Sequence, residues 1–380
     1  MRSFTEIKRS KKGQYFFKVT WILFLCVISA LLARYVLIGI SDMLAIGKPS
    51  DTVMVEIPEN SSLDSIAEIL KQNKMISQKE FFKLYVRATK ATKKFSSGIY
   101  EMETNMDYQA IINHLKNESN IKNIAEITFT EGMSINDYAG LLEKHHVCSK
   151  DEFLKCCKSR QFDDKYSFLK DISNSEDRVY KLEGYLFPDT YKFYQGEDAS
   201  DIIVKFLNNY QKKTGKKTEI EGYKGKTSIE ELAKSKGMDM DKLLNIASLI
   251  QAEAANKEDM YKVSSVIQNR LATLKSGGKN SSGEYSLSVL RIDATVYYPY
   301  KNKASVPKSI APTFHGTYDT YTIEGLPPGP ICNPGMDAIL AALNPLQTNY
   351  YYYCHSSSGE AFYARSNAEH LANLKKAGLV

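Results

Sequence analysis

The chain has 380 residues, of which 43% are hydrophobic and 25% charged, a mixture typical of globular domains rather than of disordered or fibrous chains. Its formal net charge of +6 comes mostly from residues 1–20, which hold six basic side chains against one acidic one. The other 360 residues carry 44 Lys and Arg against 43 Asp and Glu. A body this close to neutral lacks the basic surface that binding to a phosphate backbone needs, so nucleic acid is disfavoured as a partner.

Residues 19–40 form an apolar run, VTWILFLCVISALLARYVLIGI, in which Arg34 is the only charged side chain. At about 1.5 Å per residue, a helix of this length crosses a hydrocarbon core of roughly 30 Å. A cleaved signal peptide is the alternative, but no small-x-small cleavage site follows the run. We therefore expect an uncleaved membrane helix at 19–40 after a basic cytoplasmic tail at 1–18. The basic residues before the span predict that residues 48–380 lie outside the cytoplasm, anchored to the cell membrane by a single pass.

Cysteine spacing argues against a metal site. One cysteine, Cys26, lies in the apolar run, and the remaining five are Cys148, Cys156, Cys157, Cys332 and Cys354. Because five is an odd number, at least one thiol is unpaired within a monomer. No pair shows the spacing of a Cys/Cys or Cys/His metal site, and two adjacent cysteines make a poor chelate. The sequence therefore implies no metal and no cofactor.

Two segments 72 residues apart, 55–82 and 127–154, align without gaps. The identical pairs are Glu59/Glu131, Ser62/Ser134, Ala67/Ala139, Leu70/Leu142, Ser77/Ser149, Glu80/Glu152 and Phe81/Phe153. In both copies apolar residues first alternate as in a strand and then recur at helical spacing. The first shared serine of each copy stands where a helix N-cap would, and the second starts another short helix.

β-like segments follow each copy, at 98–102 and around 180–193, so the repeated unit reads strand, helix, helix, strand. This order resembles the LysM module, whose family role is to hold glycans that contain N-acetylglucosamine. The resemblance predicts a first LysM-like module at 51–122 and a second, with a hairpin, at 123–211. A repeated spacer that holds no sugar is the alternative.

Residues 183–194, EGYLFPDTYKFY, are rich in aromatic side chains. These could stack on sugar rings, but we favour the core of a hairpin turned at Pro188 and Asp189. The set is Tyr185, Phe187, Tyr191, Phe193 and Tyr194. Beyond a predicted helix at 199–211, the polar, Gly/Lys-rich segment 212–228 is predicted to be a linker, with a further domain at 228–380.

The C-terminal region contains one well-placed carboxylate. Ser228 and Glu231 predict a capping box for a short helix, and Asp239 caps a longer one that contains IASLIQAEA, residues 246–254. Glu253 lies at the edge of the apolar stripe of this helix. A partly desolvated carboxyl has a raised pKa, which suits it to deliver a proton at neutral pH. From spacing alone, an ordinary interface residue remains the alternative.

Two loop regions follow this helix. NRL at 269–271 closes the next helix and precedes a Gly/Ser-rich loop and LRIDATVYY at 290–298. TYDTYTIEGLPPGPICNPG at 317–335 contains two Pro-rich turns, and Asn333 with Pro334 starts another helix. Rigid loops of this kind shape a cleft, although they also serve simply as connections between elements.

Five blocks in order resemble the YceG-like endolytic murein transglycosylases. They are EGYLFPDTY at 183–191, IASLIQAEA with VIQNRL at 246–271, IDATVYY at 292–298, YDTYTIEGLPPGPICNPG at 318–335 and AFYARSNAEHLAN at 361–373. The resemblance covers residues 51–380 and includes one N-terminal membrane helix. It implies a membrane-anchored lytic transglycosylase that cuts nascent peptidoglycan strands between MurNAc and GlcNAc, with cell-wall synthases as partners. The implied fold is α+β, with LysM-like modules before a C-terminal catalytic domain.

The family's catalytic acid is a Glu within an ASxxxxE-type helix, and only Glu253 matches it. The usual Asp-Pro-Thr appears as Asp293-Ala294-Thr295, and the usual Gln or Lys upstream is Arg291. The usual Tyr-Asn-Thr-Tyr appears as Tyr318-Asp319-Thr320-Tyr321. The change from Pro to Ala bears on the rigidity of the loop rather than on the chemistry.

The resemblance also implies roles for residues around Glu253. Asp293 and Thr295 are expected to orient sugar hydroxyls, and Tyr321 and Asn333 to line the cleft. Asn269 and Arg270 are expected to position neighbouring loops, with or without touching substrate. Weaker candidates are Glu258 and Asp259 as partner carboxylates, His355 and His370 without an assigned role, and Tyr350–Tyr353 as a half-buried strand.

A lone carboxylate fits this chemistry, because the C6 hydroxyl of muramic acid replaces water as the attacking group and leaves an anhydro-MurNAc end. Ordinary glycosidases use two carboxylates. Two other functions stay open: a non-catalytic peptidoglycan-binding scaffold for cell-wall synthesis, and a muramidase that uses water and leaves a reducing end.

Overall fold

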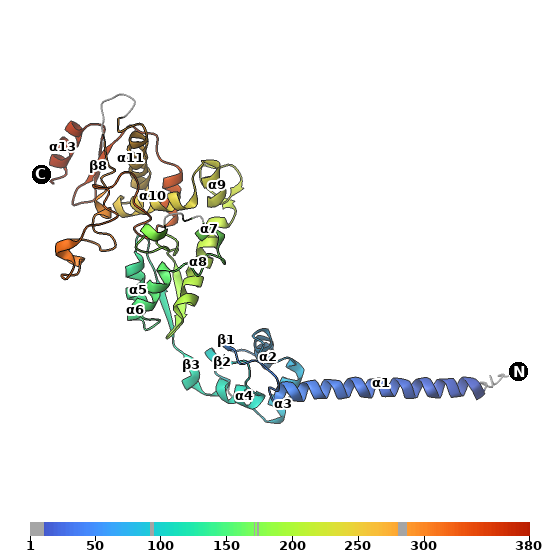
Figure 1. Cartoon of the computed structure of the whole chain (residues 1–380). Coiled ribbons are helices and arrows are strands. Elements are labelled where there is room, and N and C mark those ends of the chain that lie inside the picture. Colours follow the sequence, from blue (N-terminus) through green and yellow to red (C-terminus); the bar gives the residue numbers. More distant parts are fainter. Residues whose placement is uncertain (1–10, 92–94, 171, 173–174, 280–286) are drawn as a thin grey trace. The chain divides into compact units, whose positions relative to one another are not determined.

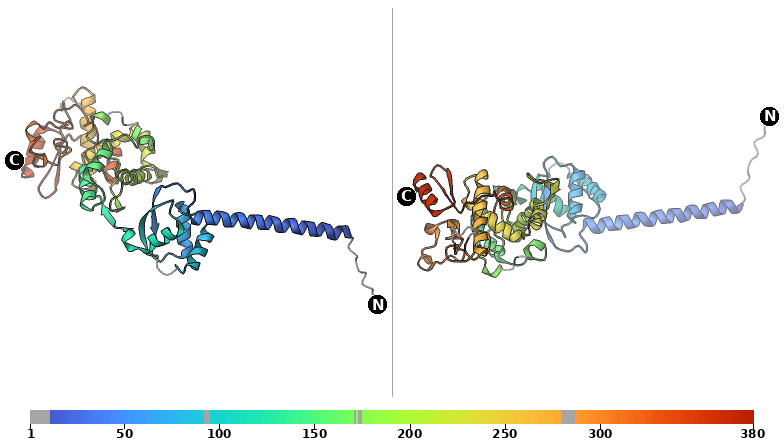
Figure 2. Two further views of the ribbon diagram at one scale, coloured as in Figure 1. Left: turned by 60° about the horizontal axis from the view of Figure 1, so that its bottom comes forward. Right: turned by 90° about the horizontal axis from the view of Figure 1, so that it is seen from above.

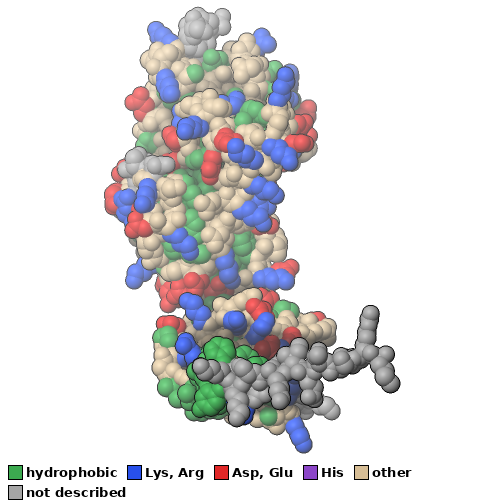
Figure 3. Space-filling view, turned by 90° about the vertical axis from the view of Figure 1, so that its right-hand side faces the viewer, with side chains coloured by type: hydrophobic (Ala, Val, Ile, Leu, Met, Phe, Trp, Pro, Cys, Tyr) green, Lys and Arg blue, Asp and Glu red, His purple; other side chains and the backbone are tan. Residues whose placement is uncertain are grey.

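The computed structural model describes residues 11–91, 95–170, 172, 175–279 and 287–380, so most of the predicted basic tail lies outside the described residues. The chain is α+β, with many helices and short strand pairs, as predicted (Figure 1). It divides into two compact units, Met1–Ile124 and Ala125–Val380. On the face shown in Figure 3, basic and acidic side chains are interspersed over the second unit rather than gathered into one basic patch.

The first unit begins with a long helix and continues with the first copy of the repeat. Its elements are α1 Lys11–Met43, β1 Thr52–Ile57, α2 Leu63–Gln72, α3 Lys79–Ala88, β2 Gly98–Glu103, α4 Tyr108–Lys116, the 3-10 turn Glu118–Asn120 and β3 Ile121–Lys122. The strands form one sheet in the order β1-β2-β3, with β1 and β2 antiparallel and Thr52 opposite Glu103. Its buried core lies between this sheet and the helices.

α1 is long and apolar enough to cross a membrane over Tyr15–Met43, and most of its large apolar side chains are exposed. Figure 2 shows it projecting from the first unit as one continuous helix. At its end α1 packs against α3, where a Cβ on Gly39 would stand 2.5 Å from the ring of Phe81. The glycine therefore permits the close approach of the two helices.

Asp42, in the last turn of α1, fixes the same junction. Its carboxylate is buried and accepts hydrogen bonds from the main-chain N–H groups of Ser77 and Gln78, over 2.8 and 3.0 Å, and from the Tyr108 hydroxyl, over 2.5 Å. Lys48 pairs with it over 2.8 Å. The end of the apolar helix is thus joined to the first module by buried polar contacts, not only by the chain.

The second unit contains the second copy of the repeat and the rest of the chain. Its elements are β4 Ile124–Thr128, α5 Ile135–Lys144, α6 Lys150–Lys158, α7 Ser167–Lys170, β5 Thr190–Tyr194, α8 Ala199–Gly215, β6 Thr218–Glu219, β7 Lys226–Thr227, α9 Ile229–Ser235, α10 Met240–Glu253, α11 Lys257–Lys275, α12 Met336–Leu343, β8 Tyr352–His355, β9 Ala361–Ala364 and α13 Asn367–Lys376. Short 3-10 turns lie at Ser175–Asp177, Asp293–Thr295, Lys303–Ser305 and Ala311–Thr313.

The strands and the two helices of the repeat are present in both units, as β1-α2-α3-β2 and as β4-α5-α6-β5, but in the second unit α7 and a 3-10 turn lie between α6 and β5. Ser62 and Ser134 cap the first helix of each copy through their side chains, as predicted. In the second copy, however, the predicted hairpin turned at Pro188 and Asp189 does not form. Residues 181–186 lie in turns, and β5 pairs with β4, because the repeat itself supplies the partner strand.

The aromatic side chains of this segment do fill a core, since Tyr185, Phe187, Tyr191 and Phe193 are all buried. That core continues without interruption from the second repeat to α12. The segment 212–228, predicted as a linker, completes α8 and forms the small β6–β7 pair, and its Ile220 and Tyr223 pack on the same core. The predicted boundary at 212–228 therefore does not separate two cores.

Candidate functional site

α10 places Glu253 at its last residue. Asp239 caps the helix by accepting from the main-chain N–H of Lys242 over 2.6 Å, and the following residues from Leu243 to Ile250 are buried. α10 packs against both α11 and α12, which fixes its direction. Because burial ends at the last turn, Glu253 is partly exposed while its helix is anchored in the core.

The Glu253 carboxyl is held by two donors from distant segments. The main-chain N–H of Ala294 donates to Oε1 over 3.2 Å, and the Tyr353 hydroxyl donates to Oε2 over 3.0 Å. Burial raises the pKa of Glu253, the two hydrogen bonds oppose the rise, and the negative charge of Asp293 adds to it. The net shift is upward, so a proton is retained at higher pH than by an ordinary Glu.

Asp293 and Tyr321 form an exposed pair beside Glu253. The Tyr321 hydroxyl donates to Oδ1 of Asp293 over 2.5 Å, and both side chains are exposed. Burial of its hydroxyl together with the neighbouring Asp293 raises the pKa of Tyr321 to about 12, so it stays a donor at neutral pH. An exposed aromatic ring with an adjacent carboxylate can pack against a sugar and accept from its hydroxyls.

The other predicted site residues lie behind this surface. The Arg270 guanidinium donates to the carbonyl oxygens of Leu290, Arg291 and Tyr351 over 2.8 to 3.0 Å. The Asn269 amide donates to the carbonyl oxygens of Thr348 and Tyr350 over 2.9 and 3.0 Å. Both residues therefore fix the segments that carry Asp293 and Tyr353. Positioning these loops without touching substrate is one of the two roles that the sequence analysis expects for them.

Two predicted contacts with substrate are not available in this structure. Thr295 is fully buried, and its hydroxyl donates to the carbonyl oxygen of Ile292 over 2.7 Å and lies 3.0 Å from the hydroxyl of Thr320. It therefore stabilises the turn instead of facing a sugar. Asn333 is also fully buried and does not line an open surface.

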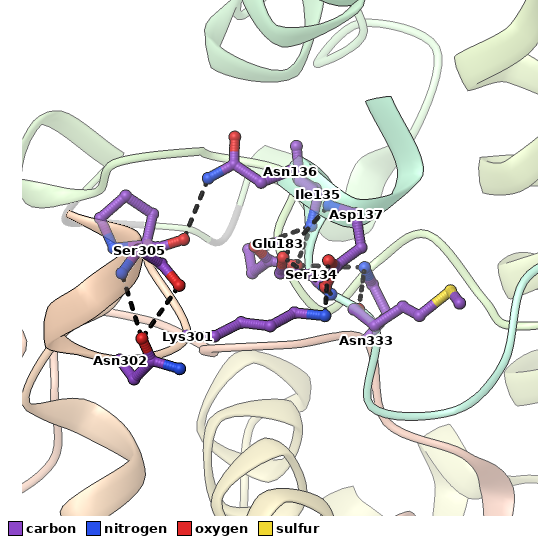
Figure 4. Close-up of polar contacts among 11 residues, drawn as sticks. Ser134, Ile135, Asn136, Asp137, Glu183, Lys301, Asn302, Ser305 and Asn333 are labelled. Atoms are coloured by element: carbon purple, nitrogen blue, oxygen red, sulfur yellow. Dashed lines mark hydrogen bonds and ion pairs between the residues drawn. The ribbon is translucent and has the colours of Figure 1, made fainter. Parts of the chain in front are cut away.

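Asn333 instead belongs to a buried network centred on Glu183 (Figure 4). Glu183 is fully buried and accepts from the main-chain N–H of Ile135 at 3.0 Å, from the Asn333 amide at 3.0 Å and from the Tyr298 hydroxyl at 2.8 Å. Burial raises the pKa of Glu183 to about 8, against the effect of its donors. The network joins the second repeat to the loops that follow Asp293 and precede α12.

The sequence analysis does not single out Glu183, Tyr353 or the main-chain N–H of Ala294, which the structure places in or behind the candidate site. Glu183 is the first residue of the EGYLFPDTY block. The aromatic residues of this block determine its sequence pattern, so nothing in the pattern points to the carboxylate. The prediction of a half-buried strand covers Tyr353, and β8 does begin at Tyr352, but period-two alternation cannot say which hydroxyl reaches a carboxyl.

A second polar cluster lies next to β8. His355 Nε2 is 2.7 Å from Oδ2 of Asp259. The Asp259 carboxylate also accepts from the main-chain N–H of Ala255 over 2.9 Å and from the Tyr363 hydroxyl. Asp259 is buried and committed to these contacts, whereas Glu258 is exposed. Among the described residues, no group of three or more His, Cys, Asp or Glu side chains is placed to hold a metal, and the six cysteines are free thiols.

Comparison with known proteins agrees with this organisation. A profile of the YceG-like family matches residues 55–376. An endolytic murein transglycosylase of Bacillus subtilis (strain 168) is 33% identical over 331 residues, which cover 84% of this chain and 83% of that protein. Endolytic murein transglycosylases of Streptococcus pneumoniae strains D39 and R6 are 25% identical over 378 residues, and this chain spans 64% of their length.

The fold is also similar to a solved structure. The crystal structure of a YceG-like protein from Listeria monocytogenes superposes with a TM-score of 0.51 at 26% identity and covers 86% of this chain and 100% of that one. Since the family profile spans most of the chain, from the first repeat to the last helix, this protein belongs to the YceG-like family.

Proposed function

We propose that this protein is a lytic transglycosylase that cleaves peptidoglycan glycan strands internally, with Glu253 as the single general acid and base. The observation that carries the proposal is the setting of Glu253, a carboxyl of raised pKa held by two donors beside an exposed Asp293–Tyr321 pair. The relatives named endolytic murein transglycosylases support the reaction class.

In the proposed mechanism, protonated Glu253 donates its proton to the glycosidic oxygen between MurNAc and GlcNAc as that bond breaks. The carboxylate that results is stabilised by the donors Ala294 N–H and Tyr353 O–H. It then accepts the proton of the MurNAc C6 hydroxyl as that oxygen attacks the anomeric carbon and closes the anhydro ring. The proton returns to the enzyme, so the cycle consumes no water.

The apolar helix supports a membrane location for this activity. α1 has the length and composition of a span, and its end is fixed to the first module through Asp42. We infer a single pass with the two units outside the cytoplasm, because the basic residues precede the span. Such an anchor keeps the site near newly made strands, where cell-wall synthases act.

A muramidase is the second candidate, and the carboxylate of Asp293 is the observation that favours it. Asp293 is near enough to raise the pKa of Glu253, and hydrolytic glycosidases use a second carboxylate as base or nucleophile. In the transglycosylase, Asp293 binds substrate hydroxyls and is not required for the chemical step. The two mechanisms therefore differ in their products and in the effect of removing this charge.

Mass spectrometry of glycan fragments tests the proposal. The full chain in detergent is incubated with uncrosslinked peptidoglycan strands, as wild type, Glu253→Gln and Asp293→Asn. We expect anhydro ends from the wild type, a loss of about 100-fold or more with Glu253→Gln, since general acids contribute about 10²–10⁴-fold, and anhydro ends at a reduced rate with Asp293→Asn. Glu258→Gln, at an exposed carboxyl in the first turn of α11, is the matched control and is expected to keep full activity.

Three outcomes would contradict the proposal. Reducing ends from the wild type, lost with Asp293→Asn, indicate the muramidase. Binding of strands without any cleavage indicates the non-catalytic scaffold. Full activity of Glu253→Gln would mean that Glu253 is not the general acid.

A further inference from the structure

The two repeats share the backbone of the loop between their first strand and first helix. Asn60 in the first copy has φ +58°, and Gly132, 72 residues later, has φ +83°. The same correspondence holds at the end of the first helix, where Lys74 and His146 have φ +59° and +57°. Left-handed conformations at matching positions are rare for side chains other than Gly, so the two loops are equivalent in structure as well as in sequence.

In the second copy this loop is occupied by a segment of the chain itself. Asn333 accepts from the main-chain N–H of Gly132 over 3.0 Å and donates its own N–H to the carbonyl oxygen of Met133 over 3.0 Å. One residue therefore exchanges two main-chain hydrogen bonds with the loop, as in the pairing of two strands.

The side chain of Asn333 completes the contact. Its carboxamide oxygen accepts from the N–H groups of Gly184 and Leu186 over 3.0 and 3.1 Å, in the segment that leads into β5. Its NH₂ group donates to Met133 and to the buried Glu183 carboxylate (Figure 4). The groove between the two loops of the second repeat thus holds an extended peptide and a side-chain amide.

In the first copy no segment of the described residues occupies the corresponding groove. A pocket of about 480 Å³ lies between the β1–α2 loop and the segment that leads into β2, and it is lined by, among others, Pro58, Asn60, Ser61, Phe95, Ser97 and Glu118. Asn60 and Ser61 correspond to Gly132 and Met133. Within the described part of the chain, the N–H of Asn60 and the carbonyl of Ser61 have no hydrogen-bond partner. Glu118, an exposed residue of the 3-10 turn after α4, adds a carboxylate to the pocket wall.

We propose that this pocket of the first repeat binds an extended segment of a partner protein that carries a side-chain carboxamide, in the way the second repeat binds Asn333. The paired main-chain bonds are the reason to choose a peptide, because each residue of a peptide offers both an N–H and a C=O to one loop. The first repeat is then a docking site outside the catalytic unit. The second repeat is closed to such a partner by the chain's own segment.

The test uses a synthetic peptide that copies the seated segment, PPGPISNPG, which is residues 327–335 with Cys332→Ser. Its fluorescent form is titrated with the full chain in detergent, and PPGPISLPG, which lacks the carboxamide, is the control peptide. We expect saturable binding tighter than about 1 mM for the first peptide and at least tenfold weaker binding for the second. Because the readout is binding, it is independent of whether the protein cleaves glycan.

Two variants locate the site. Ser97→Trp fills the pocket and Glu118→Ala removes its carboxylate, and each is expected to weaken the peptide at least tenfold without changing the melting temperature. Glu56→Trp, an exposed position of β1 outside the pocket, is expected to bind as the wild type does. The proposal is overturned by the absence of saturation, by wild-type affinity of the peptide for both pocket variants, or by N-acetylglucosamine oligomers that bind there while the peptide does not.

Discussion

The main-chain N–H of Ala294 donates to Oε1 of Glu253 over 3.2 Å, from the 3-10 turn Asp293–Thr295. A proline at this position would have no N–H, so Ala294 gives the Glu253 carboxyl a donor that a proline could not supply. The donor stabilises the ionised carboxyl and so opposes the rise in pKa that burial causes. The residue at position 294 therefore bears on the protonation of Glu253 as well as on the stiffness of the loop.

Ala294→Pro is expected to raise the pKa of Glu253, because it removes that hydrogen bond. The acid must be protonated to act, so the alkaline limb of the kcat/KM profile moves to higher pH. Ala294→Gly keeps the N–H and is the matched control, with a limb at the wild-type position. An unmoved limb in the proline variant, with cleavage retained, means that the Ala294 bond does not tune the acid.

Tyr353→Phe removes the second donor. Burial and the neighbouring Glu253 raise the pKa of Tyr353 far above neutrality, so the hydroxyl is a donor throughout the working range. A hydrogen bond to a charged group contributes about 1.5–3 kcal/mol, and we expect kcat to fall about 10- to 100-fold as the carboxylate forms without it. The alkaline limb again moves to higher pH.

Tyr350→Phe is the control for this variant. It removes a hydroxyl from the same chain segment while the Asn269 contact to the Tyr350 carbonyl is kept. Equal losses of kcat in the two variants would mean that the segment, and not the Tyr353 hydroxyl, matters to the reaction.

Asp42→Ala tests the junction between the apolar helix and the first module. It leaves the N–H groups of Ser77 and Gln78 and the Tyr108 hydroxyl without their buried acceptor. Each buried donor left unsatisfied costs about 1–3 kcal/mol, so for three donors we expect the first unit to lose roughly 3–9 kcal/mol of its free energy of unfolding. Hydrogen exchange at the start of α3 reports the loss, and Asp51→Ala, at an exposed acidic residue, leaves it unchanged. Unaltered protection with Asp42→Ala would show that packing at Gly39 holds the junction alone.

Local patterns predicted much of this fold. Helix caps at Ser62, Ser134, Ser228 and Asp239 depend on side chains within one turn, and the repeat depends on apolar spacing, so both are visible in the sequence. The pairing of β5 with β4 was not predicted, because the Pro-Asp turn signal favours a hairpin and the competing partner lies over 60 residues earlier. Long-range pairing is decided by the whole core and leaves no local signal.

The candidate site likewise contains residues that the sequence can identify and residues whose placement it cannot. Helical spacing places Glu253 at the edge of a buried stripe, and the resemblance of IASLIQAEA to the family's helix singles it out from other residues at such an edge. The burial of Thr295 and Asn333 cannot be predicted from the sequence. A polar side chain next to a turn gives the same sequence pattern whether it faces solvent or forms hydrogen bonds with buried groups. Their partners, Thr320 for one and Gly184 and Leu186 for the other, come from segments that only the folded chain brings together.

Glu183→Gln tests the buried network that joins the second repeat to the loops carrying Tyr298 and Asn333. The folded pKa of about 8 lies above that of an exposed Glu, so the folded state holds a proton that the unfolded state has already lost. The stabilising contribution is therefore complete below about pH 4.5 and is lost as pH rises to about 8. Glutamine has the shape of the protonated acid and cannot ionise, so the variant's melting temperature is expected to vary less with pH over this range. Glu126→Gln, at an exposed position of β4, keeps the wild-type slope. A Glu183→Gln curve parallel to the wild type would mean that Glu183 is ionised in the folded protein across the whole range and that its three donors outweigh its burial.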